Sequence, residues 1–332
     1  MEIKTESKTL QEISNQFNLG NLKEFSGMNG GIVNTSYKVI TNKGNFVIQR
    51  LSPIFDERTM QDYQEVQSYL RTNGLYVPIL LPSIYGKPFY RNSHLWRVFE
   101  YIPNDSSPEI SPEVAFQAGK TLGIFHSLMK QYEFKPKFKL EGFHDTPRYL
   151  AHLSEVYNSP ENKEKARRVE EEYNLINKRI KQHQIPKDLA KTIIHGDPKI
   201  GNFLFKDGKV VAILDLDTLM EASELVDLGD AFRSWCKPKN NNFDPNIFDK
   251  ALEGYSTENH LEYDESQVYS AIGFITLELA ARFLTDYFEE SYFTWDSTKF
   301  PSSAEHNLNR TRKVIDYYQQ FSREFAKRRH LG

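Results

Sequence analysis

One stretch of the sequence brings together polar residues whose types and spacing suit phosphoryl transfer. It covers residues 193–218 and reads IIHGDPKIGNFLFKDGKVVAILDLDT. Asp197 follows a short apolar run, Asn202 lies five positions further on, and Asp215 follows a second apolar run. Phosphoryl-transfer sites need a carboxylate that handles a hydroxyl proton, and an amide and a carboxylate that hold metal. The stretch therefore predicts such a site.

Each of these three residues suits one task. Asp197 would position the attacking hydroxyl and accept its proton, which is typically worth about 10² to 10⁴ in rate. Asn202 would offer Mg²⁺ a neutral amide oxygen, and Asp215 would add a hard carboxylate ligand. A single Asp after Gly more often caps a turn. The full pattern, HxDxxxxN followed by an apolar run and Asp215, favours catalysis.

Three other polar residues of the stretch each have two interpretations. We expect His195 to brace the loop through backbone hydrogen bonds rather than to transfer protons. Lys199 would either neutralise transferring phosphate oxygens or lie in solvent. Asp217 would be either a second metal ligand or a loop cap.

The chain before this stretch predicts a small antiparallel sheet with two helices. A Gly-rich turn at residues 27–31 joins two β-like runs, and further strands are expected at 46–51, 77–85 and 94–101. Helical spacing of apolar residues occurs at 7–17 and 56–73. The linker PNDSSP begins at residue 103, so we expect an N-terminal lobe at 1–103 and a C-terminal lobe at 104–332.

The C-terminal lobe is expected to be mostly helical. Helices are predicted at residues 113–131, 161–184, 227–235, 265–290 and 309–329, and residues 141–150 are predicted to be irregular. The chemical stretch itself is predicted as two short strands around the turn Lys206-Asp207-Gly208-Lys209. The fold class is therefore α+β.

Composition excludes several classes of partner and site. The chain has 332 residues, 39% of them hydrophobic, which is enough for a sizeable core. A net charge of −3 gives no basic field for nucleic acid or an anionic membrane. Cys236 is the only cysteine, so we expect no disulfide and no Cys-rich metal site. No secretory signal or long apolar run is evident, and we expect a cytoplasmic protein without a transmembrane helix.

The segments HGDPKIGN and ILDLD resemble the catalytic loop and metal-binding Asp of the aminoglycoside phosphotransferase/choline kinase superfamily. The resemblance implies a bilobal protein-kinase-like fold with a small antiparallel-sheet lobe and a mostly helical lobe. It also implies ATP as co-substrate, Asp197 as base, and Asn202 and Asp215 as Mg²⁺ ligands.

A narrower resemblance is to the N-acetylhexosamine 1-kinases, which phosphorylate the anomeric hydroxyl of N-acetylglucosamine or N-acetylgalactosamine. It is carried by segments spread from Gly27 to Arg312: NGGIVNTSYKV, FVIQRLSPIF, LWRVFEYIPN, ILDLDTLM, DLGDAFR, ARFLTDYFEESYF and HNLNRTR. The implied partners are ATP and a small hydroxyl-bearing acceptor, a sugar, and the implied assembly is a monomer or homodimer.

This resemblance also assigns roles to residues outside the chemical stretch. A phosphate-covering loop would include Gly27, Gly30, Gly31 and Asn34, although an ordinary hairpin is the alternative. Residues 100–102, with Glu100 and Ile102 at the ends, would form the hinge that meets adenine. Arg282 and Asp286 would face the acceptor cleft, with a surface ion pair as the alternative. Asn307 and Arg310 are weaker acceptor candidates.

Two departures from the related families stand out. Many relatives place a phosphate-binding Lys on the third strand, where this chain has Gln49 and Arg50. The usual acidic partner on the following helix would be Asp62 or Glu65. In addition, Gly196 precedes Asp197, where the sugar kinases favour Asn.

Other functions stay open at this stage. The acceptor could instead be choline, ethanolamine, another amino alcohol or an aminoglycoside, although no tight acidic cluster for a cationic acceptor is evident beyond Glu289-Glu290. The loss of the strand Lys would fit a non-catalytic nucleotide-binding module, but Asp197, Asn202 and Asp215 oppose that alternative.

Overall fold

The structure, a computed structural model, describes residues 2–28, 33–105, 108–186, 188–237, 242–260 and 263–331. The chain packs as two compact units. The first unit comprises Met1–Pro108, Lys130–Leu140 and Gly201–Met220, and the second comprises Glu109–Met129, Glu141–Ile200 and Glu221–Gly332. The first segment of the first unit ends at Pro108, five residues beyond the expected boundary at 103. The structure also differs from the expected division because two later segments pack with the N-terminal residues.

A five-stranded antiparallel sheet forms the centre of the first unit. Its strands, in spatial order, are β1 (Leu22–Gly27), β2 (Thr35–Thr41), β3 (Asn45–Arg50), β5 (Leu95–Glu100) and β4 (Tyr90–Arg91). The prediction of a strand at residues 77–85 was wrong, because only Leu80 forms an isolated bridge, to Phe99. Pro78 and Pro82 each remove a ladder donor there.

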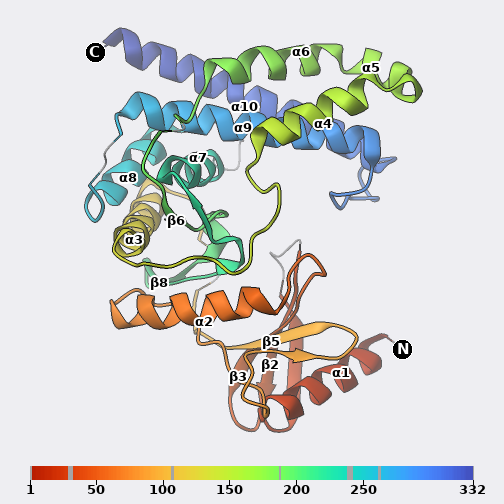
Figure 1. Cartoon of the computed structure of the whole chain (residues 1–332), viewed down its shortest axis with the longest axis vertical. Coiled ribbons are helices and arrows are strands. Elements are labelled where there is room, and N and C mark those ends of the chain that lie inside the picture. The colour runs from red at the N-terminus through yellow and green to blue at the C-terminus, as the bar shows by residue number, and fades with distance from the viewer. Residues whose placement is uncertain are drawn as a thin grey trace. The chain divides into compact units, whose positions relative to one another are not determined.

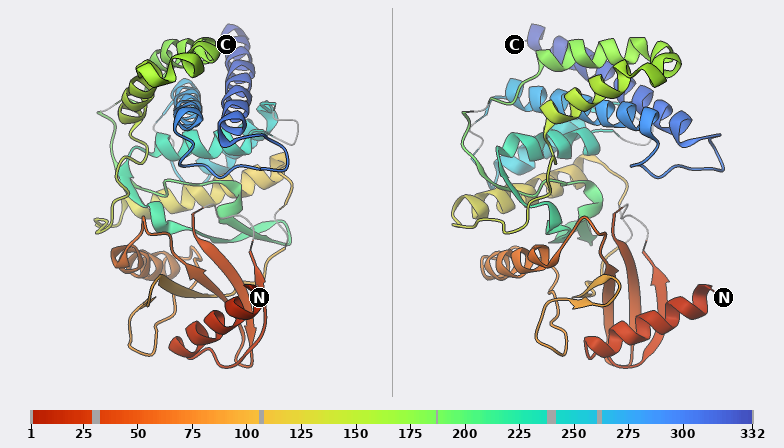
Figure 2. Two further views of the ribbon diagram at one scale, coloured as in Figure 1. Left: turned by 90° about the vertical axis from the view of Figure 1, so that its right-hand side faces the viewer. Right: turned by 45° about the vertical axis from the view of Figure 1, so that its right-hand side comes forward.

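Two helices, α1 (Glu2–Gln16) and α2 (Glu57–Thr72), bury the apolar residues of this sheet. Leu10 and Ile13 of α1 pack in one cluster with strand residues that include Val98. The next strand residue, Phe99, packs instead on Tyr63 of α2, with ring centroids 5.0 Å apart. Because successive strand side chains point to opposite faces, the two helices cover opposite faces of the sheet, as Figure 2 also shows.

A separate hairpin completes the first unit. Strands β7 (Phe203–Lys206) and β8 (Lys209–Ile213) pair as predicted, with Lys206 opposite Lys209. Asp207 and Gly208 in the turn have φ values of +50° and +74°, which a two-residue hairpin turn of this kind requires. The hairpin is tied to the rest of the unit because the N–H of Ile213 donates to the carbonyl of Tyr76, at 3.1 Å.

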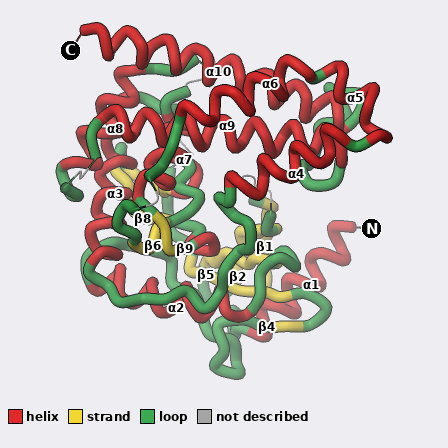
Figure 3. Tube along the Cα trace, turned by 45° about the horizontal axis from the view of Figure 1, so that its top comes forward, coloured by secondary structure: helices red, strands yellow, loops and turns green. Residues whose placement is uncertain are grey.

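The second unit is nearly all helix (Figures 1 and 3). Its helices are α3 (Pro112–Lys130, whose last residue belongs to the first unit), α4 (Thr146–Asn158), α5 (Lys163–Arg168), α6 (Glu170–Arg179), α7 (Glu224–Trp235), α8 (Pro245–Ser256), α9 (Glu265–Glu289) and α10 (Ser303–Leu331). Its short strand β6 (Thr192–Ile194) pairs with β9 (Met220–Ala222).

Helix α9 is the core element of this unit. Among the described residues it is the one helix whose length and composition would suffice to cross a membrane, but 72% of its most apolar window is buried inside the fold. Ala280, Ala281 and Leu284 of α9 pack in one cluster with residues of α4, α5, α6 and α10. The apolar composition of α9 therefore follows from its burial by other helices.

The sequence prediction for this unit contained two errors and one omission. The helix predicted at 161–184 is divided into α5 and α6 by Val169, which leaves helical geometry and is fully buried. The segment predicted as irregular, 141–150, contains the start of α4, whose N–H of Arg148 is capped by Asp145. Helix α8 was not predicted, although Asp244 and Pro245 form a regular N-terminal cap.

The contact between α3 and α8 depends on glycines of both helices, two of which are the most tightly enclosed. A Cβ added at Gly119 would lie 2.1 Å from the carbonyl oxygen of Ala251, and one added at Gly254 would lie 2.1 Å from that of Phe116. In an unhindered helix Gly→Ala stabilises by roughly 0.5–1 kcal/mol. Here we expect either substitution to lower the free energy of unfolding by about 1–3 kcal/mol, measured by urea denaturation. Gly201→Ala, where an added Cβ meets nothing within 4 Å, is the control; wild-type stability in Gly119→Ala would contradict the close helix contact.

Candidate active site

The predicted site residues fall in both units. In the second unit the loop after β6 is held by the carboxylate of Asp227 in the first turn of α7. The N–H of His195 donates to Asp227 Oδ2 at 2.7 Å, and the N–H of Gly196 donates to Oδ1 at 2.8 Å. His126 Nε2 is 2.9 Å from Oδ2. Because Asp227 is fully buried, these donors fix the backbone that leads to Asp197.

Gly196 adopts a left-handed backbone conformation, with φ of +86°. Glycine enters this region freely, and Asn is one of the side-chain-bearing residues most enriched there. The presence of Gly where the sugar kinases favour Asn therefore has a backbone explanation. This departure does not by itself argue against a sugar acceptor.

His144 holds the same loop from the other side of Gly196. Its Nε2 is 2.9 Å from the carbonyl oxygen of Gly196, and its Nδ1 is 3.1 Å from Glu278 Oε1. Both neighbours are acceptors, so both ring nitrogens must carry a proton. Burial lowers the pKa of His144, but the charge and hydrogen bond of Glu278 outweigh burial and raise the pKa to about 9. The imidazolium therefore positions the loop at neutral pH.

His195 and Lys199 flank the predicted base within this loop. The N–H of Asp197 donates to His195 Nδ1 at 3.3 Å, which confirms the expected bracing role of His195. Lys199 Nζ donates to Asp197 Oδ2 at 2.5 Å, and the two side chains are 38% and 30% exposed. Lys199 thus pairs with the carboxylate while both groups stay accessible to a ligand. Trp235 Nε1 donates to the carbonyl of Pro198 at 3.0 Å and ties the loop to the end of α7.

In the first unit, Asn202 and Asp215 lie at the open end of the β7–β8 hairpin. The N–H of Leu214 donates to the carbonyl of Asn202 at 2.8 Å, which places Asp215 next to this pair. Asp215 has φ of +61° and ψ of +57°, a sparsely populated conformation for a residue with a side chain. The hairpin therefore presents an amide and a carboxylate from adjoining positions.

These two residues fit a hard cation that is bound together with phosphates. Mg²⁺ prefers oxygen ligands and usually takes only one or two carboxylates from the protein, with substrate phosphates and water completing its shell. Across the described ranges, no group of three or more His, Cys, Asp or Glu side chains is arranged to hold a metal alone. An Asn–Asp pair completed by nucleotide phosphates is consistent with that finding.

Asp217, which the sequence left open between metal ligand and loop cap, forms a buried ion pair with Arg97. The bonds from Arg97 Nη1 and Nη2 to its two oxygens are 2.5 and 2.7 Å long, and the side chains are only 2% and 1% exposed. Asn34 Nδ2 also donates to Asp217 Oδ2, at 3.1 Å. Burial lowers the pKa of Arg97, but Asp217 outweighs it, so that the pKa is raised. Asp217 is thus engaged by protein donors.

Gln49, at the position where many relatives have the strand Lys, belongs to the same network. Gln49 lies opposite Arg97 in the pairing of β3 with β5, and its Oε1 accepts a bond from Arg97 Nε at 2.8 Å. The buried cation therefore lies one strand away from the expected position. Asp62 accepts the N–H groups of Lys137 and Phe138, and Glu65 pairs with Lys137 Nζ. The two candidate helix partners are thus both engaged by residues 137–138.

The predicted nucleotide-binding residues have different local environments. Gly27 ends β1, and an added Cβ there would meet nothing within 4 Å; Gly30 and Gly31 lie outside the described residues. Glu100 Oε1 accepts bonds from Arg71, Tyr76 and the N–H of Ile79. Within the described part of the chain, the backbone of Ile102 makes no hydrogen bond.

The predicted acceptor residues Arg282 and Asp286 do not pair with each other. The Arg282 guanidinium lies 5.1 Å from the centre of the Tyr149 ring and 5.7 Å from that of Tyr292. Asp286 is 2% exposed and accepts the N–H groups of residues 291, 292 and 293. It also accepts a bond from Asn307 Nδ2 at 2.8 Å. Asp286 therefore orders the segment after α9, which corrects both the cleft-facing and the ion-pair interpretations.

Sequence reasoning missed several residues that hold the site. Asp227, His126, His144, Glu278 and Arg97 were given no role. Asp227 was within reach because it lies in the segment DLGDAFR, which the resemblance included. Arg97 lies in another such segment, LWRVFEYIPN. His126, His144 and Glu278 lie in none, and their partners are on distant segments.

A model of the APH phosphotransferase enzyme family matches residues 24–261. The chain belongs to this family. It is 20% identical over 270 residues to a homoserine kinase of Gluconobacter oxydans (strain 621H), covering 76% of this chain and 78% of that protein. These matches make the protein a phosphotransferase that acts on small molecules.

Two solved structures share the fold. One is the microcompartment-associated aminopropanol kinase, with a TM-score of 0.69 and 13% identity, covering 96% of this chain and 98% of that one. The other is amicoumacin kinase hAmiN in complex with AMP-PNP, Ca²⁺ and Ami, with a TM-score of 0.65 and 17% identity, covering 96% of both chains. They confirm the α+β, protein-kinase-like fold class.

The Arg97–Asp217 pair predicts strongly non-additive mutations. Arg97→Met would leave a buried carboxylate without its counter-charge and should lower the free energy of unfolding by about 3–5 kcal/mol. Arg97→Met/Asp217→Leu removes both charges and should be clearly more stable than the sum of the single changes implies. Chemical denaturation of the wild type, Arg97→Met, Asp217→Leu and the double variant measures this coupling. Additive effects would show that the two side chains do not stabilise the fold as a pair.

The His144–Glu278 pair predicts a pH-dependent contribution to stability. A folded-state pKa of about 9, above the unfolded value of 6.5, means that the contribution is complete below pH 6.5 and disappears as pH rises through 9. The stability difference between wild type and His144→Gln should therefore shrink by roughly 3 kcal/mol between pH 6.5 and 9.5. Denaturation at several pH values measures it.

His183 is the matched control for this titration. Burial, with a smaller effect of Arg179, lowers its pKa to about 4, so its contribution changes only below pH 6.5. The difference between wild type and His183→Gln should stay flat from pH 7 to 9.5. A flat difference for His144→Gln as well would contradict the imidazolium assignment.

Proposed function

We propose that the protein is an ATP- and Mg²⁺-dependent kinase that transfers the γ-phosphoryl group to a hydroxyl, with Asp197 as base. The observation that carries the proposal is the buried attachment of the HGD loop to Asp227, at 2.7 and 2.8 Å. A base must be held in place to be effective, and this loop has little freedom. Asp197 itself stays 30% exposed, which suits contact with an acceptor.

The reaction breaks two bonds and forms two. The acceptor O–H would give its proton to the Asp197 carboxylate, and the acceptor oxygen would bond to the γ-phosphorus. The bond from that phosphorus to the bridging oxygen would break, and ADP would leave with the electron pair. Lys199, 2.5 Å from Asp197, would offset charge on the transferring oxygens. Asn202 and Asp215 would hold Mg²⁺, which when bound neutralises charge on the phosphates.

The first unit would bind the nucleotide. The backbone of Ile102, with that of Glu100, would meet the adenine edge, and the loop with Gly27, Gly30 and Gly31 would cover the phosphates. Asn34 and Gln49 would act indirectly, because their side chains are bonded to Asp217 and Arg97. A cytoplasmic location, with the protein as a monomer or homodimer, is part of the same proposal.

For the acceptor, we propose first the anomeric hydroxyl of an N-acetylhexosamine or related sugar, on the strength of the segments that resemble those kinases. Arg282, beside Tyr149 and Tyr292, would contact it. The relatives named above are kinases of homoserine and of aminopropanol, so a hydroxy amino acid or an amino alcohol is the second candidate.

The proposal is tested by ADP release with a panel of acceptors: N-acetylhexosamines, homoserine, aminopropanol, choline, ethanolamine and aminoglycosides. Asp197→Asn should keep nucleotide affinity and lower turnover by at least about 10²-fold.

Asp215→Ala should weaken Mg²⁺-dependent nucleotide binding, measured by calorimetry with and without Mg²⁺. Near-normal turnover in Asp197→Asn would remove Asp197 from the role of base. Nucleotide binding without ADP release from any acceptor would favour a non-catalytic module.

A further inference from the structure

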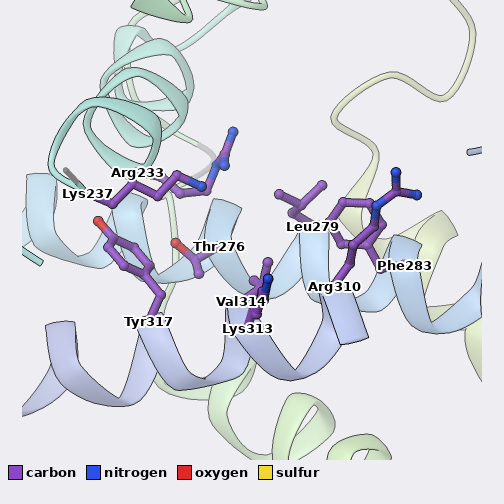
Figure 4. A pocket seen from close by; sticks show the side chains of 9 residues that line it. All are labelled: Arg233, Lys237, Thr276, Leu279, Phe283, Arg310, Lys313, Val314 and Tyr317. Carbon is purple, nitrogen blue, oxygen red and sulfur yellow. The ribbon is translucent and has the colours of Figure 1, made fainter. Parts of the chain in front are cut away.

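A cavity of about 240 Å³ lies within the second unit, between α7, α9 and α10 (Figure 4). Four of its nine lining residues are cations: Arg233 and Lys237 at the end of α7, and Arg310 and Lys313 on α10. None of the nine is acidic. In Figure 4, Arg233 and Lys237 approach one end of the cavity and Arg310 the other. The wall thus presents positive charge from two helices.

Nearby carboxylates offset only part of this charge. Arg233 Nη2 bonds to Asp230 at 2.5 Å. Arg310 donates to neutral acceptors, Asn307 Oδ1 and the carbonyl of Thr294, at 2.9 and 2.7 Å. The carboxylate near Arg310 is that of Asp286, which already accepts several N–H bonds. The residues that line the cavity therefore carry positive charge and no negative charge of their own.

The surroundings of Lys237 disfavour its charged form. Burial, and then repulsion from Arg233, lower its pKa to about 8. A cation held in this way destabilises the folded state at neutral pH, because the unfolded state binds its proton more readily. An anion in the cavity would reverse both effects by offering a counter-charge. Perturbed pKa values of this kind cluster at functional sites.

The cavity shares its supporting helix with the predicted base. Arg233 lies on α7, which also carries Asp227 and Trp235, the two residues that hold the loop of Asp197. Asp197 is near enough to contribute to the raised pKa of Arg233. At about 240 Å³ the cavity is below the usual size of a complete ligand site, which is about 300–1,000 Å³. Its volume suits one end of a ligand whose remainder extends outside it.

Building on the proposed function, we propose that this cavity binds an anionic group, a carboxylate or phosphate monoester, of the phosphoryl acceptor. Arg310, Lys313 and Lys237 hold that group while the acceptor hydroxyl reaches Asp197. Choline, ethanolamine and aminoglycosides would bring positive charge to a positive wall. A neutral N-acetylhexosamine would bring no negative charge to this wall. Its 6-phosphate, a uronic acid or a hydroxy amino acid supplies one.

The test compares ligands that differ in one charge. Calorimetry without nucleotide would use N-acetylglucosamine and its 6-phosphate, glucose and glucuronate, and homoserine and homoserine amide. We expect the acidic member of at least one pair to bind about 10-fold or more tightly than its partner, because charge-assisted hydrogen bonds are at stake. ADP release should show the same preference in KM. Equal affinities within all three pairs would overturn the proposal.

Variants show whether the cavity causes the preference. Lys313→Met, at an exposed position, and Lys237→Met should each remove most of it and leave the affinity of the neutral member unchanged. Lys237→Met should also keep or raise thermal stability, because it removes a buried cation that destabilises the folded state. A loss of the ligand preference in this variant would therefore not result from unfolding. Arg323→Met, which removes an exposed cation elsewhere on α10, is the control and should keep the preference. An undiminished preference in both cavity variants would overturn the assignment.

A last experiment distinguishes an anionic acceptor from a free anion as the ligand of the cavity. It also distinguishes a failure of this inference from a failure of the proposed kinase function. One outcome is that inorganic phosphate binds with the same dependence on Lys313, and that the enzyme releases ADP but phosphorylates no acidic acceptor. This outcome would mean that the cavity binds a free anion, and it would overturn the proposal. ADP release that depends on Asp197 but favours neutral acceptors would leave the kinase proposal intact and overturn only this inference. Anion binding without any ADP release would remove the acceptor role and the kinase proposal together.

Discussion

The carboxylate of Asp227 is the group on which the catalytic loop depends. Two consecutive backbone N–H groups and the ring of His126 converge on its two oxygens in a fully buried position. Without it, each of these donors would be buried and unsatisfied, at a cost of about 1–3 kcal/mol. The protonated His144 holds the Gly196 carbonyl of the same peptide segment. Asp197 is therefore positioned by buried groups that lie behind its loop.

Charge is distributed differently in the two units. In the first, the buried cation Arg97 is neutralised by Asp217 and bonded to Gln49, so the network stabilises the sheet and the η4 turn (Leu216–Thr218) that carries Asp217. In the second, Arg233 is paired with Asp230, while Lys237 is held with a lowered pKa. The first arrangement serves structure because its charges cancel. The second leaves a potential that a ligand can cancel, which is why we place acceptor recognition there.

Much of the fold could be predicted from local pattern. Helix spacing identified α2, α7, α9 and α10, and the Asp-Gly turn identified the β7–β8 hairpin. Two elements were predicted wrongly, because the local sequence does not show how these segments pack. Residues 77–85 were predicted as a strand although two prolines limit their pairing. Helices α5 and α6 were predicted as one helix because Val169 continues the apolar stripe of α6, and only the structure shows that its backbone leaves helical geometry.

By itself the sequence determined the reaction class, because a base, an amide and a carboxylate occur at set intervals around three short strands, β6, β7 and β8. Asp197, Asn202 and Asp215 lie within 19 residues and can be read from a single line of text. Only the tertiary structure decided what holds them. The bonds of Asp227, His144 and Arg97 join residues 32, 134 and 120 positions apart, and such separations leave no periodic signal. The cationic cavity belongs to the same class, since its charges come from two helices that meet only when the chain folds.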